Sequence, residues 1–422
     1  MNSPLQKDKI SHAPGSPYRV MVVDDSAIIR GFICRYLQED PLIEVVTTAI
    51  NGKVALSQLE KYDIEVVVLD IEMPVMDGLT ALPKMLATDE NLQVVMASTL
   101  TLKNAEVSLA ALGKGAVDYV PKPETARSVN ASIDFRREIV EKVKAWGGVR
   151  RKVLRQTLPS TDKTSDGASA RFKRPSGVAS SDGKEKAGFV TARRPAPVVA
   201  ASPRGQAETA PREIVDRKKP IVLRKGSTLS PQVLAVGSST GGPQALLAFF
   251  KALDGKVKIP VVLVQHMPKT FTAILAQHIA SATSFIAAEG VDGESLKPGH
   301  IYVAPGDHHM ICEAKDGNVV IRLNKDAPEN YCRPSVDPLF RSLTSIFKNK
   351  VLAVILTGMG HDGLKGSRDL VREGATILAQ DEESSVVWGM PGAVASAGLC
   401  SEVLPLEKIG DAVARRLAGG FA

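Results

Sequence analysis

The sequence has no long apolar run and few cysteines. No stretch approaches the ~18 apolar residues needed to cross a bilayer. The N-terminal MNSPLQKDKISHAPGSPY lacks the apolar segment of a secretory signal. The four cysteines, Cys34, Cys312, Cys332 and Cys400, form no C-x-x-C pair. We therefore expect no direct membrane insertion, no disulfide or metal framework built on cysteine, and a reducing, cytoplasmic environment.

Positive charge is scarce outside one segment. The net charge is +7, but residues 151–225 hold 18 Lys and Arg against 7 Asp and Glu, a local balance of +11. The rest of the chain therefore carries −4. Because the basic excess belongs to this segment, the charge does not indicate a folded DNA-binding surface, and we expect no DNA partner.

The basic segment lies within a stretch of low complexity. Residues 147–230 are rich in Ser, Pro, Ala, Gly, Lys and Arg, with few aromatic residues and no sustained periodicity. Such a stretch buries too little apolar surface to offset its ordering entropy. We predict a flexible basic linker at 147–230, which joins domains at 18–146 and 231–422 and follows a disordered lead at 1–17. A basic arm that docks on an acidic partner is the alternative.

Short apolar runs alternate with helical patterns on both sides of this linker. Before it, we expect strands at 19–23, 43–49, 64–70, 92–98 and 116–120. After it, we expect strands at 232–237, 260–265, 350–358 and 375–380. Such alternation predicts two α/β domains with doubly wound parallel sheets, flavodoxin-like in the first and Rossmann-like in the second. Gly-rich turns in 284–325 predict one or two antiparallel hairpins inserted in the second domain.

Polar side chains stand at successive strand ends of the first domain. Asp24 and Asp25 follow the first strand, and Asp70 ends the third. Ser98 closes the fourth strand, and Lys122 lies just past the fifth. Because parallel strands end at one edge of a sheet, these groups should meet there. Three crowded carboxylates need a hard cation such as Mg²⁺, and the set suits a phosphoryl group received by one Asp.

The same motifs carry a family resemblance. VVDDS, VLDIEMPVMDG, VMAST and YVPKP resemble the motifs of response-regulator receiver domains across residues 18–130. The resemblance implies that a histidine kinase phosphorylates Asp70. It implies a Mg²⁺ site formed by Asp24, Asp25, Asp70 and the main-chain carbonyl of Glu72. It also implies that the phosphorylated state is read out by Ser98, Tyr119 and Lys122.

A second set of polar residues follows strands of the second domain. After QVLAV, the run GSSTGGPQAL places Ser238, Ser239 and Thr240 on an exposed strand-turn-helix elbow. Its main-chain amides could stabilise an oxyanion. His266 follows the next strand, and Asp362 follows the strand at 350–358. Three such loops converge on one edge of a parallel sheet, which permits a Ser-His-Asp triad.

The residues alone leave this triad open. Gly-rich turns at helix starts more often bind phosphate or simply pack tightly, although this turn fits neither of the two usual nucleotide-binding motifs. Other candidates for base and orienting acid exist. They are Asp307, His308 and His309 after the strand HIYVAP, and Asp381 after ATILAQ.

A wider resemblance favours one assignment. AVGSSTGGPQAL, VVLVQHMP, YVAPGDHHM, RPSVDPLF, VILTGMGHDG and QDEESSVVWGMPGAV are similar to the catalytic domain of the chemotaxis protein-glutamate methylesterases, the CheB family, over about residues 231–400. The resemblance implies Ser239 as nucleophile, His266 as base and Asp362 as its orienting partner. It places Thr240 and the run 358–360, with Met359, in the pocket, as oxyanion candidates. Cys332 stands where His is more often expected, a departure that we expect not to touch the triad.

The implied reaction is hydrolysis of glutamate methyl esters on chemoreceptors through a seryl acyl-enzyme, and the resemblance also implies deamidation of glutamines by the same chemistry. No cofactor is expected in the esterase site. The resemblance also implies that the unphosphorylated receiver covers the esterase cleft. Two rival functions are a response regulator with a non-enzymatic binding domain and a DNA-binding regulator. The first would require Ser239 to be dispensable, and the second has no helix-turn-helix to support it.

Overall fold

The computed structural model describes residues 15–99, 101–122, 133–157 and 220–419. Most of the predicted disordered lead and of the predicted flexible linker, residues 1–14 and 158–219, lies outside the described residues.

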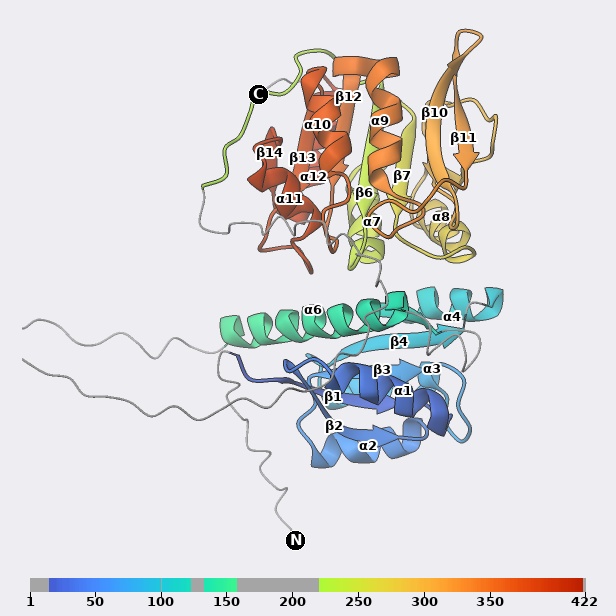
Figure 1. The fold of residues 1–422 in the computed structure, drawn as a ribbon, viewed down its shortest axis with the longest axis vertical. Helices are drawn as coiled ribbons and strands as arrows, with labels where there is room; N and C mark the ends of the chain where they lie inside the picture. Colours follow the sequence, from blue (N-terminus) through green and yellow to red (C-terminus); the bar gives the residue numbers. More distant parts are fainter. Residues whose placement is uncertain (1–14, 100, 123–132, 158–219, 420–422) are drawn as a thin grey trace, which may run out of the picture. The chain divides into compact units, whose positions relative to one another are not determined.

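The first domain is a five-stranded parallel sheet with helices on both faces (Figure 1). Its strand order is β2-β1-β3-β4-β5, the flavodoxin-like order. Its elements are β1 Tyr18–Val23, α1 Ala27–Gln38, β2 Ile43–Ala49, α2 Gly52–Lys61, β3 Val66–Asp70, α3 Gly78–Thr88, β4 Gln93–Thr99, α4 Leu102–Gly113, β5 Asp118–Lys122 and α6 Ile133–Thr157. The predicted fold of this domain is therefore confirmed, with each strand within about two residues of its expected position.

Local sequence explains where the helices of this domain begin. The side chains of Ser26, Asn51, Asp77 and Thr101 each accept a hydrogen bond from a main-chain amide of the following helix. These N-caps satisfy amides that have no partner within the helix. All five residues of β3 are buried, as expected for a central strand covered by helices on both faces.

Helix α6 extends eleven residues beyond the domain end expected at residue 146. Its charged residues resemble linker composition, but two of its arginines are buried in ion pairs. Arg151 binds both carboxylate oxygens of Glu65, at 2.6 and 2.7 Å, and Arg150 lies 2.8 Å from Asp89. Because these pairs neutralise the buried charges, a charged segment can pack as the last helix of the domain.

The second domain is built around a seven-stranded parallel sheet in the order β14-β13-β12-β6-β7-β9-β8. Its elements are β6 Val233–Ser238, α7 Gly242–Ala252, β7 Val261–Gln265, α8 Phe271–Ala282, β8 Ile286–Glu289, β9 His300–Val303, β10 His309–Lys315, β11 Asn318–Asn324, α9 Val336–Phe347, the 3₁₀ helix η1 Lys348–Lys350, β12 Val351–Ile355, α10 Leu364–Arg372, β13 Thr376–Gln380, α11 Met390–Ser396, β14 Glu402–Leu404 and α12 Leu406–Leu417. Strands β10 and β11 form one antiparallel hairpin outside this sheet, which confirms the predicted insertion.

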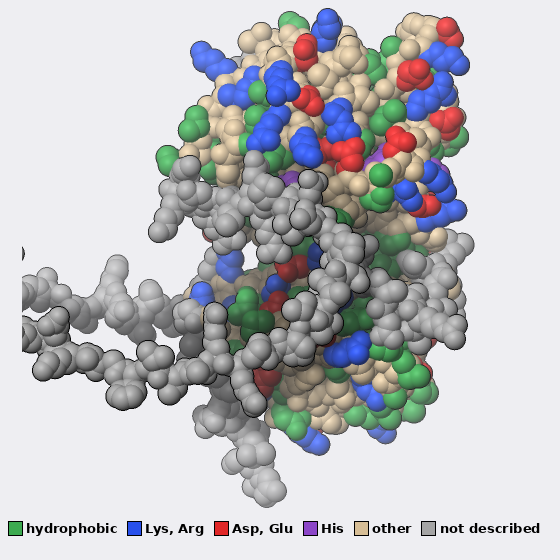
Figure 2. Space-filling model, viewed as in Figure 1, with side chains coloured by type: hydrophobic (Ala, Val, Ile, Leu, Met, Phe, Trp, Pro, Cys, Tyr) green, Lys and Arg blue, Asp and Glu red, His purple; other side chains and the backbone are tan. Residues whose placement is uncertain are grey.

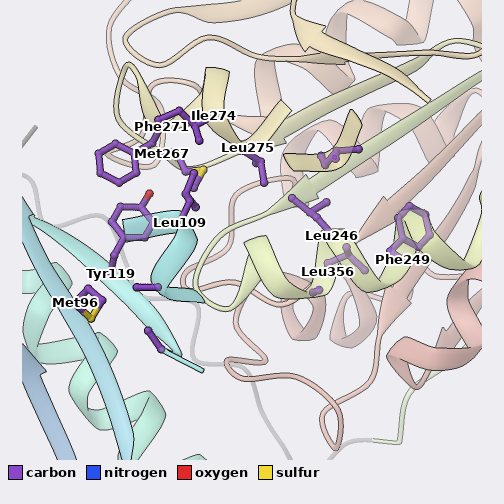
Figure 3. Close-up of a cluster of buried hydrophobic side chains, with 14 of the residues drawn as sticks. Met96, Leu109, Tyr119, Leu246, Phe249, Met267, Phe271, Ile274, Leu275 and Leu356 are labelled. Carbon is purple, nitrogen blue, oxygen red and sulfur yellow. The ribbon is translucent and has the colours of Figure 1, made fainter. Parts of the chain in front are cut away.

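Alternate residues of the central strands face opposite layers. Leu234 and Val236 point into a core with α7, α8 and α12, whereas Val233 and Ala235 point into a core with α9, α10 and α11. Figure 3 shows Leu246 and Phe249 of α7 among the buried side chains of the first of these cores. Each fully buried side chain of this size contributes about 1.5–3 kcal/mol to stability, so the two cores fix the sheet that carries the site.

Segment 220–230, expected within the linker, packs on the second domain. The amide of Arg224 donates to the carbonyl of Cys400, and the amide of Ser227 donates to the hydroxyl of Thr376. Among the described residues, no helix is both long and apolar enough to cross a membrane. Figure 2 shows Lys and Arg side chains interspersed with Asp and Glu over the displayed face of this domain.

Candidate active site and phosphorylation site

Ser239 lies in the turn between β6 and α7. Gly241 in this turn has a φ of 74°, a left-handed conformation that favours glycine. A Cβ atom on Gly242 would lie 1.9 Å from the side-chain oxygen of Gln265, so only glycine fits there. The chain therefore bends sharply at the end of β6, and Ser239 stays partly exposed between the strand and the helix.

Gln265, the last residue of β7, ties the Ser239 turn to the His266 loop. Its side-chain amide donates to the main-chain carbonyl of Ser239 at 2.9 Å and to that of His266 at 3.3 Å. Its oxygen accepts a hydrogen bond from the hydroxyl of Ser238 at 2.7 Å. Gln265 is only 2% exposed. This buried amide, which we call the Gln265 clamp, fixes the spacing of the two loops.

His266 and Asp362 form a direct pair. The Nε2 atom of His266 lies 2.7 Å from an Oδ atom of Asp362, although the two residues are 96 positions apart in the sequence. His266 follows β7, and Asp362 lies in the loop between β12 and α10. These strands flank β6, so the loops that follow all three converge at one edge of the sheet, as predicted.

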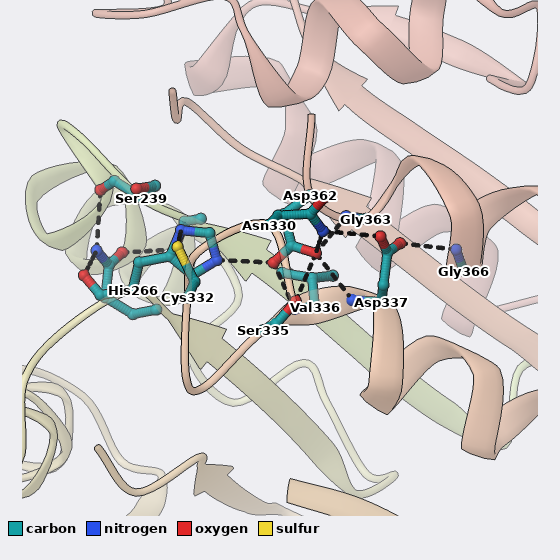
Figure 4. A network of polar contacts seen from close by, with 12 residues as sticks. Ser239, His266, Asn330, Cys332, Ser335, Val336, Asp337, Asp362, Gly363 and Gly366 are labelled. Atoms are coloured by element: carbon teal, nitrogen blue, oxygen red, sulfur yellow. Dashed lines mark hydrogen bonds and ion pairs between the residues drawn. The ribbon is translucent and has the colours of Figure 1, made fainter. Parts of the chain in front are cut away.

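The Asp362 carboxylate is surrounded by hydrogen-bond donors (Figure 4). Besides His266, its donors are the Nδ2 group of Asn330, the hydroxyl of Ser335 and the amides of Val336, Asp337 and Gly363. Burial by itself would favour the neutral acid, but His266 and these donors stabilise the anion and bring the pKa of Asp362 to about 2. Asp362 is therefore a fixed negative charge against the imidazole.

A second acid lies beside Asp362. The Asp337 side chain is fully buried and accepts hydrogen bonds from Asn330 and from the amide of Gly366. Burial, and then repulsion from Asp362, raise the pKa of Asp337 to about 6. The two neighbouring carboxyls therefore differ in pKa because Asp362 has the larger set of donors.

Sequence reasoning did not place two side chains at this pair: Asn330 was not singled out, and Cys332 was noted only as a departure from the family pattern that should not touch the triad. Asn330 donates to both Asp337 and Asp362, and the Cys332 sulfur lies 3.4 Å from the Nδ1 atom of His266. Both precede RPSVD, a motif quoted for the family resemblance, but neither follows a strand of the main sheet. Gln265 carried a weak signal, because it is a polar residue at the end of an apolar strand.

Ser239 is near this pair but is not bonded to it. Among the hydrogen bonds of the described residues, none joins its hydroxyl to His266. Its amide donates to the carbonyl of Thr357 at 3.0 Å, so that amide is occupied. Thr240 is buried and Met359 is partly buried, and a Cβ on Gly358 would come within 2.9 Å of the Cβ of Ser239. The 358–360 run therefore lies against the serine.

The rival base and acid candidates have other partners. Asp307 pairs with Arg333 at 2.6 Å and with Lys325 at 3.2 Å. The ring of His308 lies 3.3 Å from the carbonyl of Gly306, and that of His309 lies 3.1 Å from the carbonyl of Ala327. The Asp381 carboxylate accepts two hydrogen bonds from Ser384. None of these hydrogen bonds and ion pairs involves Ser239.

The first domain brings together the predicted acidic residues. Asp24, Asp25 and Asp70 each place a carboxylate oxygen within 4.8 Å of the other two. The Lys122 ammonium lies 2.6 Å from Asp70 and 3.1 Å from Asp24. Burial raises the pKa of Asp70 to about 6, although the neighbouring Lys122 opposes this shift. Three oxygen donors with one balancing cation suit a hard divalent ion such as Mg²⁺.

The other predicted receiver residues lie in β4, in β5 and in the loop that follows β3. Ser98 is buried, and its hydroxyl accepts a hydrogen bond from Ser108 at 2.8 Å. Tyr119 is also buried, with the Lys142 ammonium 4.8 Å from its ring centre. Glu72 is exposed two residues after Asp70, where its main-chain carbonyl is the predicted ligand.

The architecture defines a class of protein: a serine-hydrolase-like α/β domain preceded by a receiver. Family models agree with this division. The response regulator receiver domain matches residues 20–134, and CheB methylesterase matches residues 234–413.

Similar proteins extend over nearly the whole chain. The chain is 48% identical over 407 residues to protein-glutamate methylesterase/protein-glutamine glutaminase 1 of Rhodospirillum rubrum, with 96% of each chain covered. It is also 48% identical over 392 residues to the protein of that name in Paramagnetospirillum magneticum, covering 93% of this chain and 94% of the relative. The crystal structure of the Thermotoga maritima CheB methylesterase catalytic domain matches at 41% identity, covering 44% of this chain and 99% of that one, with a TM-score of 0.43. This chain belongs to the family of protein-glutamate methylesterases/protein-glutamine glutaminases.

Proposed function

We propose that this protein hydrolyses γ-methyl esters of glutamate on chemoreceptors and deamidates glutamines there, under the control of phosphorylation at Asp70. Methanol leaves in the first reaction and ammonia in the second. The observation that carries the proposal is the buried His266–Asp362 pair beside the Ser239 turn. A cytoplasmic location suits a substrate on the cytoplasmic helices of receptors.

Ser239 acts as the nucleophile. Its hydroxyl attacks the ester carbonyl, and an acyl-enzyme forms as methoxide leaves with a proton. Water then attacks this intermediate and releases the glutamate. Because the Ser239 amide already donates to Thr357, the amides of Thr240 and Met359 are the candidate donors to the oxyanion.

His266 acts as the base through its Nδ1 atom. Asp362 holds the Nε2 atom at 2.7 Å, so Nδ1 is the nitrogen left to accept the serine proton. The hydroxyl of Ser239 must move within hydrogen-bond reach of Nδ1 as substrate binds. Asp362 then stabilises the imidazolium that forms, which is the role of the carboxylate in a triad.

The receiver supplies the control. Asp70 accepts a phosphoryl group from a histidine kinase, with Asp24, Asp25 and the Glu72 carbonyl completing a Mg²⁺ site. Bound Mg²⁺ would neutralise charge on the transferred phosphoryl group. Lys122 already contacts Asp70, so it is placed to balance the charge of the phosphorylated side chain, and Ser98 and Tyr119 would respond to that state.

The direct test is release of methanol from a methylated receptor by the full-length protein. We expect a small phosphodonor with Mg²⁺ to raise the rate, and Asp70→Ala to stay at the basal rate with or without the donor. Ser239→Ala should lower the rate by ~10³-fold or more, since triad losses are of that order.

Ser238→Ala is the matched control for the nucleophile. Ser238 is buried and donates to Gln265, so its loss should affect packing far more than chemistry. Near-normal methanol release by Ser239→Ala would disprove the nucleophile assignment. A phosphodonor response that survives in Asp70→Ala would disprove the assigned phosphorylation site.

A further inference from the structure

The turn Glu329–Cys332, between β11 and α9, has an unusual backbone. Glu329 and Cys332 exchange two main-chain hydrogen bonds, at 3.1 and 2.9 Å, across Asn330 and Tyr331. Both central residues are left-handed, with φ values of 52° and 64°. Asn is favoured in such turns, but a Tyr there costs about 1–2 kcal/mol. Tyr331 is 76% exposed, so burial of its own side chain does not offset this strain.

The neighbours of Tyr331 in the turn explain why the strained backbone persists. Asn330 points inward and donates to Asp362 at 2.8 Å, while Cys332 points inward against the Nδ1 atom of His266 at 3.4 Å. Figure 4 shows these two side chains on either side of the His266–Asp362 pair. Strained residues concentrate where the surroundings over-determine them, which is common at functional sites. The turn thus holds both members of the pair.

Cys332 contacts the one ring nitrogen that the reaction needs. Asp362 occupies Nε2, so Nδ1 must accept the proton of Ser239. A thiol that donates to Nδ1 selects the tautomer with its hydrogen on Nε2, which is the tautomer a base requires. If the thiol proton moves fully onto Nδ1, a thiolate and an imidazolium result. The imidazolium has no lone pair for the serine proton until the proton returns to sulfur.

We propose that Cys332 is a positioning residue for the base: its thiol engages Nδ1 of His266 between turnovers, and the proton shared by sulfur and nitrogen sets the pH above which that nitrogen can accept the proton of Ser239. This role rests on the proposed triad. It extends the assignment of His266 as the base, because it explains what contacts the Nδ1 atom while the Ser239 hydroxyl is not bonded to it.

The charges around the ring support this role. Among the described residues, the titratable groups hydrogen-bonded to the ring are Asp362 and Cys332. Asp337 lies beyond Asp362 and is linked to it through Asn330, which donates to both carboxylates. On the neighbouring turn and loop, Glu329 is paired with Arg341 and Asp307 with Arg333. Burial disfavours the imidazolium, but the Cys332 sulfur and the Asp362 carboxylate outweigh it and hold the pKa of His266 well above its usual value.

The pH profile of kcat/KM in the full-length protein tests the proposal. The base must be unprotonated, so a partner that stabilises the imidazolium moves the acidic limb to higher pH. We expect Cys332→Ala and Cys332→Ser to move that limb to lower pH by about one unit, because each removes a contact partner that favours the imidazolium. If Cys332 only filled space, its replacement would change kcat or KM by the same factor at all pH values. An unmoved limb in both variants overturns the proposal.

Cys332→Ser and Cys34→Ser complete the design. Serine can still donate to Nδ1 but does not ionise, so Cys332→Ser should move the limb as Cys332→Ala does while lowering the plateau kcat less than Cys332→Ala. Cys34, in α1 of the receiver, is also partly exposed, and its replacement should leave the profile unchanged. If Ser239→Ala remained active, the triad itself would fail, a result distinct from an unmoved limb.

Thiol alkylation gives a readout that does not depend on turnover. Burial raises the pKa of Cys312 and of Cys400 to about 12, so these thiols should react slowly with iodoacetamide. In the Cys34→Ser background, the observed alkylation should therefore report Cys332. We expect His266→Gln to slow this alkylation at neutral pH at least several-fold. An equal alkylation rate with and without the imidazole would overturn the proposal.

Discussion

Buried carboxylates occur at the edges of both parallel sheets, and the two domains stabilise them differently. In the receiver, Asp70 and Asp24 share the ammonium of Lys122. In the esterase domain, Asp362 is held by amides, a hydroxyl and an imidazole. The pKa of Asp70 is raised to about 6 by burial despite Lys122, whereas the donors around Asp362 bring its pKa to about 2 despite burial.

The difference matches the role that we propose for each carboxylate, Asp70 as phosphoacceptor and Asp362 as the orienting acid. A phosphoacceptor has to change its bonding during the signal, and a single ammonium group can be shared with an incoming phosphoryl group. An orienting acid must keep its charge and position through every turnover, and fixed main-chain donors do this without reorganisation. Donor-held and cation-held carboxylates should therefore respond differently to substitution.

Removing the charge of Asp362 should have the largest effect. Asp362→Asn keeps the shape but places an amide against groups that all donate, and the imidazolium loses its counter-charge. We expect kcat for methanol release to fall by ~10³-fold or more. Asp381→Asn, in the loop after the adjacent strand β13, should stay near wild type. A loss below ~10-fold for Asp362→Asn would show that the hydrogen-bond donors around Asp362, which we call the donor cage, do not hold a catalytic carboxylate.

Removing the cation of the receiver site should mainly affect stability. Lys122→Met leaves two buried carboxylates without their shared partner, and breaking such a pair typically costs ~3–5 kcal/mol. We expect a matching fall in the free energy of unfolding of the receiver, partly restored by Mg²⁺, in denaturant titrations. The exposed Lys84→Met should change stability by less than ~0.5 kcal/mol. Equal stability of the two variants would contradict the cation-held assignment.

Asn330 allows the donor cage to be weakened one step at a time. Asn330→Gly removes the two side-chain bonds while suiting the left-handed backbone, and should cost ~1–3 kcal/mol. Asn330→Ala removes the same bonds and adds ~1 kcal/mol of strain. Both variants should also lower kcat for methanol release by ~10-fold. The free energy of unfolding and kcat should be measured on the same preparations. Identical stability of the Gly and Ala variants would show that the turn relaxes.

The smallest effect should appear in the pH dependence of stability. The pKa of Asp337 rises from 3.8 to about 6 in the folded protein, so the folded state binds more protons than the unfolded chain between these values. This contribution to stability is therefore lost as pH rises from about 4 to about 6. Asp337→Asn should flatten that part of the profile in denaturant midpoints, whereas the exposed Asp411→Asn should not. An unchanged slope would mean that Asp337 does not titrate there.

The sequence was most informative for candidate site residues that lie at or just after the end of a strand. Asp24, Asp70, Ser239 and His266 could be located because each stands at or just after the end of an apolar strand, and a parallel sheet brings those ends to one edge. Segment 350–358 was expected to be a longer strand than β12, since the apolar pattern continues through the buried Leu356 after pairing stops.

Contacts made by turns and ion pairs could not be predicted in this way. Asn330 and Cys332 reach the site through a left-handed turn, and no periodicity marks such a position. The end of α6 was assigned to the linker because Arg150 and Arg151 look like solvated charges. Only the folded domain shows that Asp89 and Glu65 bury them.

The Gln265 clamp has a consequence for mutational tolerance. A side chain at Gly242 would displace the amide that holds the carbonyls of both Ser239 and His266. One substitution at a helix start would thus misalign nucleophile and base together, although Gly242 has no chemical role of its own. A random screen for inactive but folded protein should therefore recover substitutions at position 242 as readily as substitutions in the proposed triad. Mapped on the structure, such substitutions would include the Gln265 clamp as well as the triad.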